Sequence, residues 1–89
     1  MSKAALDHLT SIMAKLAGGE VRVNAVAPGL VATPWTDEWT ALKEGVTAIA
    51  PLHRVATPDD VAEAVLAFVG VRYATGQTLL VDGGLGLVI

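Results

Sequence analysis

The chain has 89 residues, of which 53% are hydrophobic and 17% are charged, and its mean hydropathy is +0.55. A net charge of -3 provides no basic surface for phosphate backbones, so nucleic-acid binding is not expected. The absence of cysteine excludes disulfides and thiolate metal ligands. The apolar runs are shorter than the roughly 20 residues of a membrane span, and the first residues lack a signal-peptide pattern. The composition therefore predicts a cytoplasmic protein without a membrane segment.

Residues 3–17 carry apolar side chains at spacings of three and four, which predicts a helix with one apolar face. Ser2 is the expected N-cap, and Gly18-Gly19 supplies the stop. The polar side is expected to hold Lys3, Asp7, Thr10, Ser11 and Ala14. The predicted apolar face consists of Ala5, Leu6, Leu9, Ile12, Met13 and Leu16.

Residues 21–27 are valine-rich and almost continuously apolar, which is typical of a strand covered on both faces. Pro28-Gly29 is expected to end it. Residues 30–51 show no clean period and carry both tryptophans, Trp35 and Trp39. We expect a long loop there, with one or two short helical pieces around residues 37–44.

Thr57-Pro58-Asp59-Asp60 is a helix start, because a threonine cap precedes a proline and two acids that face the positive end of the helix dipole. The helix is expected to end at Gly70, and residues 77–81 read as a second buried strand. The order predicts an α/β fold with two parallel strands joined through a crossover. Two strands with unpaired edges make a poor sheet alone, so the pattern indicates part of a larger fold.

Three segments together resemble the C-terminal half of a classical short-chain dehydrogenase/reductase. They are Ser2-Lys3-Ala4-Ala5-Leu6, the run Val21 to Gly29, and Thr75-Gly76-Gln77 followed by Val81-Asp82-Gly83-Gly84. The resemblance implies a Rossmann-type domain whose doubly wound sheet has seven strands, with this chain supplying the last two. Residues 1–89 would then be the C-terminal portion of that single domain, without the half that binds the dinucleotide phosphates.

The resemblance also implies a nicotinamide cofactor. The sequence does not distinguish NAD from NADP. Lys3 corresponds to the lysine of a Tyr-x-x-x-Lys pair, which lowers the pKa of the phenol and binds the nicotinamide ribose. The matching tyrosine position falls two residues before Met1. Tyr73 corresponds to a packing residue. The implied cofactor-binding residues are Lys3, Pro28, Gly29, Val31 and Thr33.

We therefore expect a fragment of an NAD(P)-dependent oxidoreductase that interconverts alcohols and carbonyls, with no activity of its own because the Gly-rich turn, serine and tyrosine are missing. Two alternatives stay open: a non-catalytic, self-associating module, and half of a split enzyme completed by an N-terminal chain. A homodimer or homotetramer is expected in each case. His8 and His53 lack further ligands at metal spacing, so no metal site is expected. Asp59 and Asp60 are expected to complement the helix dipole, and Asp82 to form a turn.

Overall fold

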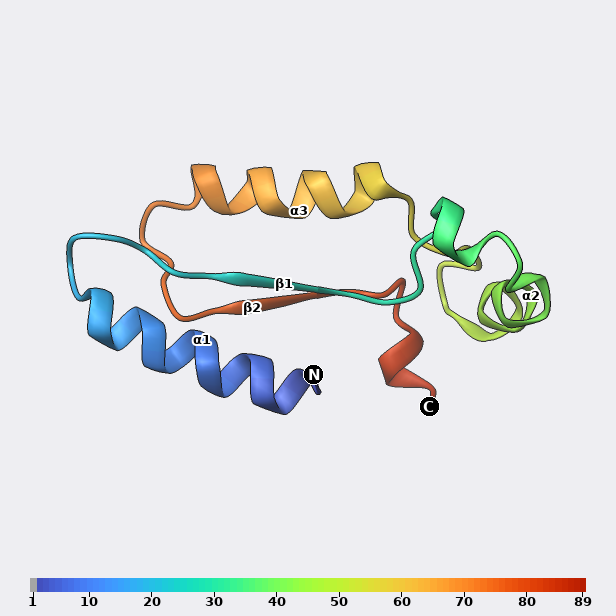
Figure 1. Ribbon diagram of the computed structural model, residues 1–89, viewed down its shortest axis with the longest axis horizontal. Coiled ribbons are helices and arrows are strands. Elements are labelled where there is room, and N and C mark those ends of the chain that lie inside the picture. Colours follow the sequence, from blue (N-terminus) through green and yellow to red (C-terminus); the bar gives the residue numbers. More distant parts are fainter. Residues whose placement is uncertain (1) are drawn as a thin grey trace.

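The computed structural model describes residues 2–89 and contains three helices, two strands and two short 3-10 turns (Figure 1). In chain order they are α1 (Lys3–Ala17), β1 (Ala25–Pro28), η1 (Pro34–Thr36), α2 (Thr40–Ile49), α3 (Pro58–Gly70), β2 (Thr78–Val81) and η2 (Leu85–Leu87).

The two strands pair in parallel, with Ala25 opposite Thr78 and Pro28 opposite Val81. Helix α3 covers one face of this sheet and α1 covers the other, so the strands form the middle layer (Figure 1). The predicted α/β arrangement of two parallel strands with flanking helices is confirmed. Strand β1 is shorter than the predicted 21–27 and includes Pro28, whose missing N–H is tolerated at a sheet edge.

Local signals set the helix ends where the sequence predicts them. The Ser2 hydroxyl accepts a hydrogen bond from Ala5 N at 3.1 Å, and Gly18 ends α1 with a φ of 60°. At α3 the Thr57 hydroxyl accepts from Asp60 N at 3.3 Å, while the Asp60 carboxylate accepts from Thr57 N at 2.7 Å. This reciprocal capping box satisfies two of the backbone donors that a helix start leaves free.

The side of α1 that meets the strands is not its predicted apolar face. Thr10 and Ala14, assigned to the polar side, are its buried residues, whereas Leu9, Met13 and Leu16 are 44%, 48% and 83% exposed. Thr10 is tolerated in the interface because its hydroxyl donates to Leu6 O at 2.7 Å. The small Ala14 side chain suits close packing of a helix on a narrow sheet. The apolar stripe of α1 is real, but it faces away from the strands.

The connection between β1 and α3 contains more helix than predicted. Residues 34–36 form η1, and α2 covers residues 40–49 rather than the short pieces expected around 37–44. Tyr73, which corresponds to a packing residue of the family, has a fully exposed side chain within residues 2–89.

Arg22 and Asn24 tie the approach to β1 to the end of α3. The Arg22 guanidinium donates to Phe68 O at 3.0 Å and Val71 O at 2.8 Å. The Asn24 amide donates to Ala74 O at 3.0 Å. Carbonyls at a helix C-terminus lack intrahelical partners, so these donors close α3 and fix the start of the sheet.

The chain exposes more surface than its mass requires. Its accessible area is 6271 Å², against about 4,900 Å² for a folded monomer of 9.1 kDa. The only buried apolar residues among those described are Ala14, Ala50 and Ala64. The helices found in residues 2–89 are too short or too polar to cross a bilayer. Many large apolar side chains, among them Leu16, Trp35 and Leu66, therefore lie on surface that the chain itself does not cover.

Candidate functional site

The segment that follows β1 is held by a close approach of two backbones. Gly29 N donates to Val81 O at 3.0 Å, which extends the sheet pairing by one residue. A Cβ at Gly29 would lie 3.0 Å from Asp82 Cβ and 3.2 Å from Asp82 Cα. A side chain here would force Asp82 or the loop to shift by a few tenths of an ångström, so glycine permits this close path of the loop as it leaves the strand.

A second anchor holds the same loop against the segment that enters α3. Ala56 N donates to Leu30 O at 3.0 Å and Ala32 N donates to Ala56 O at 2.8 Å, forming an isolated parallel bridge between Val31 and Ala56. The backbone N–H of Val31 has no acceptor within residues 2–89. The loop therefore holds a backbone donor whose hydrogen bond is not made within residues 2–89.

Thr36, which the sequence did not single out, organises the inside of this loop. Its side chain is buried, and its hydroxyl accepts from Thr33 N at 3.0 Å and lies 2.9 Å from Val31 O. The Thr-x-x-Thr spacing at the start of η1 is the signal that could have identified it. Thr36 is a positioning residue for the backbone around Val31 and Thr33.

Lys3 lies in the first turn of α1, which runs antiparallel to the strands, so its end of the helix lies toward the carboxyl ends of β1 and β2 (Figure 1). Its Nζ is 2.9 Å from Asp7 Oδ2, and the two side chains are 48% and 43% exposed. The Lys3 ammonium, followed by the Thr78 hydroxyl, lowers the pKa of Asp7 below its usual value. Lys3 therefore forms an ion pair with Asp7, one helical turn further along α1. The sequence alone did not identify this i,i+4 pair.

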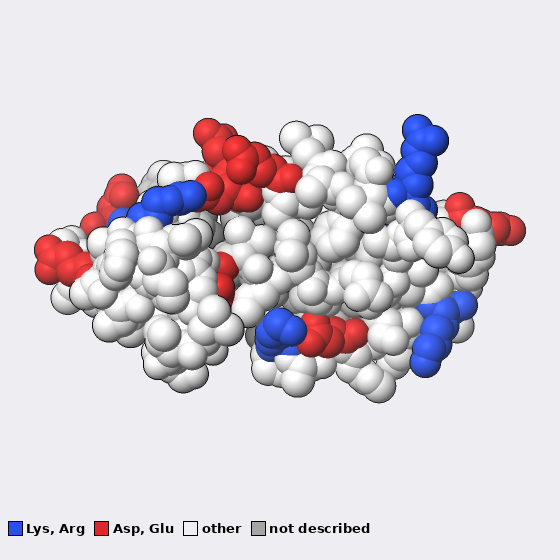
Figure 2. Space-filling model, turned by 180° about the vertical axis from the view of Figure 1, so that it is seen from behind, with Lys and Arg blue, Asp and Glu red and all other residues white. Residues whose placement is uncertain are grey.

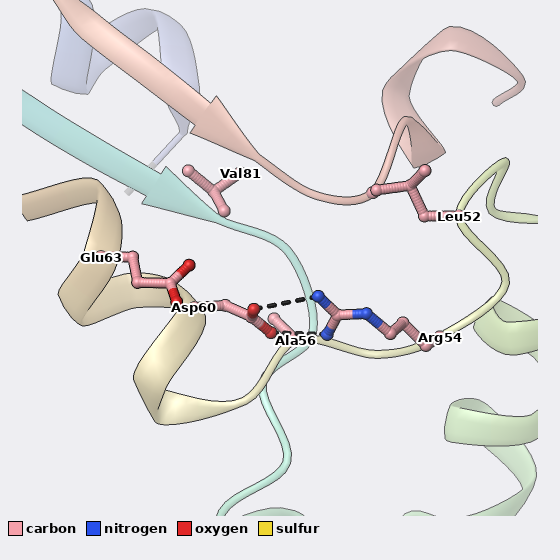
Figure 3. Close-up of a pocket in the computed structure, with 7 residues that line it drawn as sticks. Leu52, Arg54, Ala56, Asp60, Glu63 and Val81 are labelled. Carbon is pink, nitrogen blue, oxygen red and sulfur yellow. Dashed lines mark hydrogen bonds and ion pairs between the residues drawn. The ribbon is translucent and has the colours of Figure 1, made fainter. Parts of the chain in front are cut away.

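A small pocket of about 120 Å³ lies where β2 meets the start of α3, and it holds a paired arginine (Figure 3). Arg54 donates to both carboxylate oxygens of Asp60, at 2.6 and 2.9 Å. The guanidinium beside it, with help from Thr57, holds the pKa of Asp60 well below the usual range. The Arg54–Asp60 pair ties the segment before α3 to the first turn of that helix. Asp60 therefore does more than complement the helix dipole.

Asp82 shapes the turn after β2 as expected. Its carboxylate accepts from Gly84 N at 2.9 Å and from Gly86 N at 2.8 Å. Figure 2 shows that charged side chains on one face stand in separate small groups, with wide uncharged areas between them. This distribution offers no continuous charged surface on that face for a polyanion or polycation.

Sequence-predicted site residues thus fall on two elements. Pro28, Gly29, Val31 and Thr33 share the anchored loop at the carboxyl end of β1, where open parallel sheets bind ligands. Lys3 stands on α1, on the other side of the sheet from α3 but toward the same end of the strands.

Known proteins share both the sequence and the fold of this chain. Residues 1–86 match the family model described as enoyl-(acyl carrier protein) reductase. The 3-oxoacyl-[acyl-carrier-protein] reductase FabG of Thermotoga maritima is 41% identical over 88 residues, covering 94% of this chain and 36% of that protein.

Two solved structures superimpose closely on the chain. A small-chain dehydrogenase in complex with NADPH gives a TM-score of 0.85 at 32% identity, over 94% of this chain and 40% of the other. A short-chain dehydrogenase/reductase family protein gives a TM-score of 0.77 at 42% identity, over 98% of this chain and 36% of the other. The chain spans between 36% and 40% of the length of these three proteins.

Proposed function

The chain belongs to the short-chain dehydrogenase/reductase family, and from that premise we propose that it acts as the carboxyl-terminal part of an NAD(P)-dependent oxidoreductase. The reaction is the interconversion of a carbonyl and an alcohol. The observation that carries the proposal is the doubly anchored loop after β1, which keeps the Val31 N–H available at the carboxyl end of a parallel strand. The NADPH-bound relative and the FabG relative support this class of chemistry.

The residues present fit the nicotinamide end of such a cofactor. The chemistry supplied by NAD(P), when bound, is hydride transfer to or from the substrate carbon. Val31 N–H would donate to the carboxamide oxygen, and the Thr33 hydroxyl would lie near the carboxamide and phosphate. Lys3 would bind the ribose hydroxyls and lower the pKa of a neighbouring phenol that moves the substrate proton.

The 89 residues alone do not supply every group that this reaction requires. Their single tyrosine, Tyr73, is fully exposed and precedes β2, at the end of the strand opposite to the anchored loop. Within residues 2–89 no strand is followed by a Gly-rich turn that opens an α-helix, because Gly83-Gly84 after β2 leads only into the 3-10 turn η2; a helix N-terminus that could hold a pyrophosphate is therefore missing there. We propose that the chain by itself transfers no hydride and binds NAD(P) weakly or not at all.

A chimera tests the proposal directly. The 88-residue segment of the Thermotoga maritima reductase that matches this chain is replaced by this chain, and reduction of an oxoacyl substrate is followed with NADPH and NADH. We expect turnover by the chimera and none by the isolated chain. Lys3→Met should lower kcat about 100- to 10,000-fold, the range for loss of acid-base function.

Lys15→Met in the last turn of the same helix is the matched control, and its kcat should equal that of the parent chimera. A folded, active chimera whose kcat ignores Lys3→Met would contradict the assigned role of the lysine. Robust turnover by the isolated chain would contradict the proposal that the site is incomplete.

Exposed apolar surface favours a second candidate, a self-associating module without catalysis. Relative to a typical monomer, the chain exposes about 1,400 Å² in excess, more than the roughly 800 Å² that each partner buries in a standard interface. The outward stripe on α1 includes Leu16, which is 83% exposed. We expect light scattering to show dimers or tetramers. Leu16→Lys should lower the measured molar mass of the assembly toward that of the monomer.

Leu66 on α3, across the sheet and 68% exposed, is the matched position. Leu66→Lys should leave the mass unchanged if α1 is the interface. If the isolated chain forms dimers or tetramers and the chimera is inactive, the self-associating module is favoured over the oxidoreductase.

A further inference from the structure

The segment that joins α2 to α3 is bonded to both segments that leave the sheet at its carboxyl end. Leu52 N donates to Gly83 O at 3.0 Å, in the turn after β2. Ala56 N donates to Leu30 O at 3.0 Å, and Ala56 O accepts from Ala32 N at 2.8 Å. This joining segment, residues 50–57, therefore links the anchored loop after β1 to the turn after β2.

Backbone contacts do not fix the middle of the joining segment. His53 has a φ of 54°, in the left-handed region that is unfavourable for residues other than glycine. Neither Arg54 N nor Val55 N donates to a backbone carbonyl within residues 2–89. The path from Leu52 to Ala56 therefore needs a further contact to hold it.

The Arg54 side chain supplies that contact (Figure 3). Its guanidinium donates to both carboxylate oxygens of Asp60, at 2.6 and 2.9 Å, and two parallel hydrogen bonds fix direction as well as distance. Asp60 is itself held in the first turn of α3, because its carboxylate also accepts from Thr57 N at 2.7 Å. The ion pair therefore sets the position of residues 54–56 relative to α3.

The main effect of this ion pair is on orientation rather than on stability. The side chains of Arg54 and Asp60 are 56% and 20% exposed, and ion pairs in contact with water add little to the free energy of unfolding. Ala56, two residues after Arg54, makes the parallel bridge to Val31, whose own N–H has no acceptor within residues 2–89. A displacement of Ala56 therefore moves the backbone around the Val31 N–H while the fold is kept.

We propose that Arg54 is a positioning residue for the nicotinamide cofactor, an inference that rests on the oxidoreductase function proposed above. Through Asp60 it holds Ala56, and through the Val31–Ala56 bridge it holds the Val31 N–H where the carboxamide oxygen would accept. Arg54 is assigned no contact with cofactor or substrate. Its removal is therefore expected to affect binding of the cofactor more than the chemical step.

The first test measures amide hydrogen exchange by NMR in the 89-residue chain. Arg54→Met removes the charge and should accelerate exchange of the Ala32 and Ala56 amides about three- to tenfold. The Gly29 amide, which donates to Val81 O, should keep its exchange rate. Arg54→Lys keeps the charge but not the two parallel hydrogen bonds, so its exchange rates should lie between those of the parent and Arg54→Met.

The second test measures the steady-state kinetics of the chimera. Arg54→Met should raise the KM for NADPH about three- to tenfold and change kcat by less than about twofold, whereas a loss of folded enzyme would lower the apparent kcat instead. Asp60→Asn should raise KM similarly, and the double variant should equal either single variant, because the two residues act as one unit. Arg72→Met is the matched control and should leave KM unchanged, since Arg72 is exposed after the end of α3 and outside the ion pairs of residues 2–89.

Circular dichroism verifies that each variant is folded, and Arg54→Lys carries both tests if Arg54→Met does not fold. Unchanged exchange at Ala32 and Ala56, additive effects on KM, or equal effects of Arg54→Met and Arg72→Met would each overturn the proposal. An active chimera whose KM is the same with and without Arg54→Met rejects the positioning role and keeps the oxidoreductase. An inactive parent chimera rejects the oxidoreductase, and with it the cofactor role of Arg54, whatever the exchange rates are.

Discussion

Gly29→Ala tests how tightly the ends of the two strands hold the candidate cofactor loop. The added Cβ would lie 3.0 Å from Asp82 Cβ and 3.2 Å from Asp82 Cα. Neither residue moves freely. Gly29 N donates a hydrogen bond to Val81 O, and the Asp82 carboxylate accepts two backbone hydrogen bonds. The strands must therefore separate by a few tenths of an ångström to admit the methyl group.

The expected magnitude combines two opposing effects. Overpacking of this kind destabilises a fold by about 1–3 kcal/mol, whereas replacing glycine by alanine restricts the unfolded chain and stabilises by about 0.4–1 kcal/mol. Gly29→Ala should therefore lower the free energy of unfolding by about 0.5–2 kcal/mol. Gly19→Ala, where a Cβ meets nothing within 4 Å, should raise it by about 0.4–1 kcal/mol.

Urea unfolding followed by circular dichroism, at one protein concentration for both variants, measures the difference. Equal shifts of the two midpoints, or a stabilised Gly29→Ala, would refute the argument that this glycine is required by close approach. In the chimera, Gly29→Ala should also raise the KM for NAD(P)H more than Gly19→Ala does, because only the former displaces the loop.

Three further outcomes are expected. Arg22→Lys should lower the free energy of unfolding by about 1 kcal/mol, because one ammonium cannot replace a guanidinium that donates to several carbonyls. Hydrogen exchange of the last backbone amides of α3 should accelerate, and an unchanged exchange rate would contradict this role of Arg22. Asp60 has a lowered folded pKa, so its contribution to stability is present above its ordinary value of 3.8 and is lost as the pH falls below it. Asp60→Asn should therefore reduce the loss of free energy of unfolding at acidic pH, so that only the loss due to Asp7 remains. An unchanged loss at acidic pH would count against the ion pair. Thr36→Val should cost about 1–3 kcal/mol through unpaired backbone groups and should raise the KM for NAD(P)H in the chimera, whereas an unchanged KM would remove its positioning role.

Local signals were sufficient to predict several parts of this fold. Thr57 to Asp60 encode a capping box within four residues, and Ser2 and Gly18 bound α1 in the same way. Parallel pairing followed from the order of the elements. The shared loop of Gly29 and Thr33 followed from its position after a strand.

Contacts between distant segments were not predictable from the pattern. Periodicity identified an apolar stripe on α1, but it does not indicate which side of the helix meets the sheet, and Ala14 rather than Leu16 faces the strands. An apolar pocket lined by Gly45 of α2 and by Leu85 exists only because Leu85, 40 residues further along the chain, is brought back beside α2. No local sequence pattern encodes such a juxtaposition.

The parallel register imposes a delay on folding during synthesis. Ala25 pairs with Thr78, which is 53 residues later, so β1 leaves the ribosome long before its partner exists. At about 5–20 residues per second, β1 waits roughly 3–10 s for β2 to be synthesised. Throughout that interval its backbone donors and valine-rich flank are open to holdase chaperones and to neighbouring nascent chains. Sheet formation is therefore timed by the synthesis of the crossover rather than by any step local to β1.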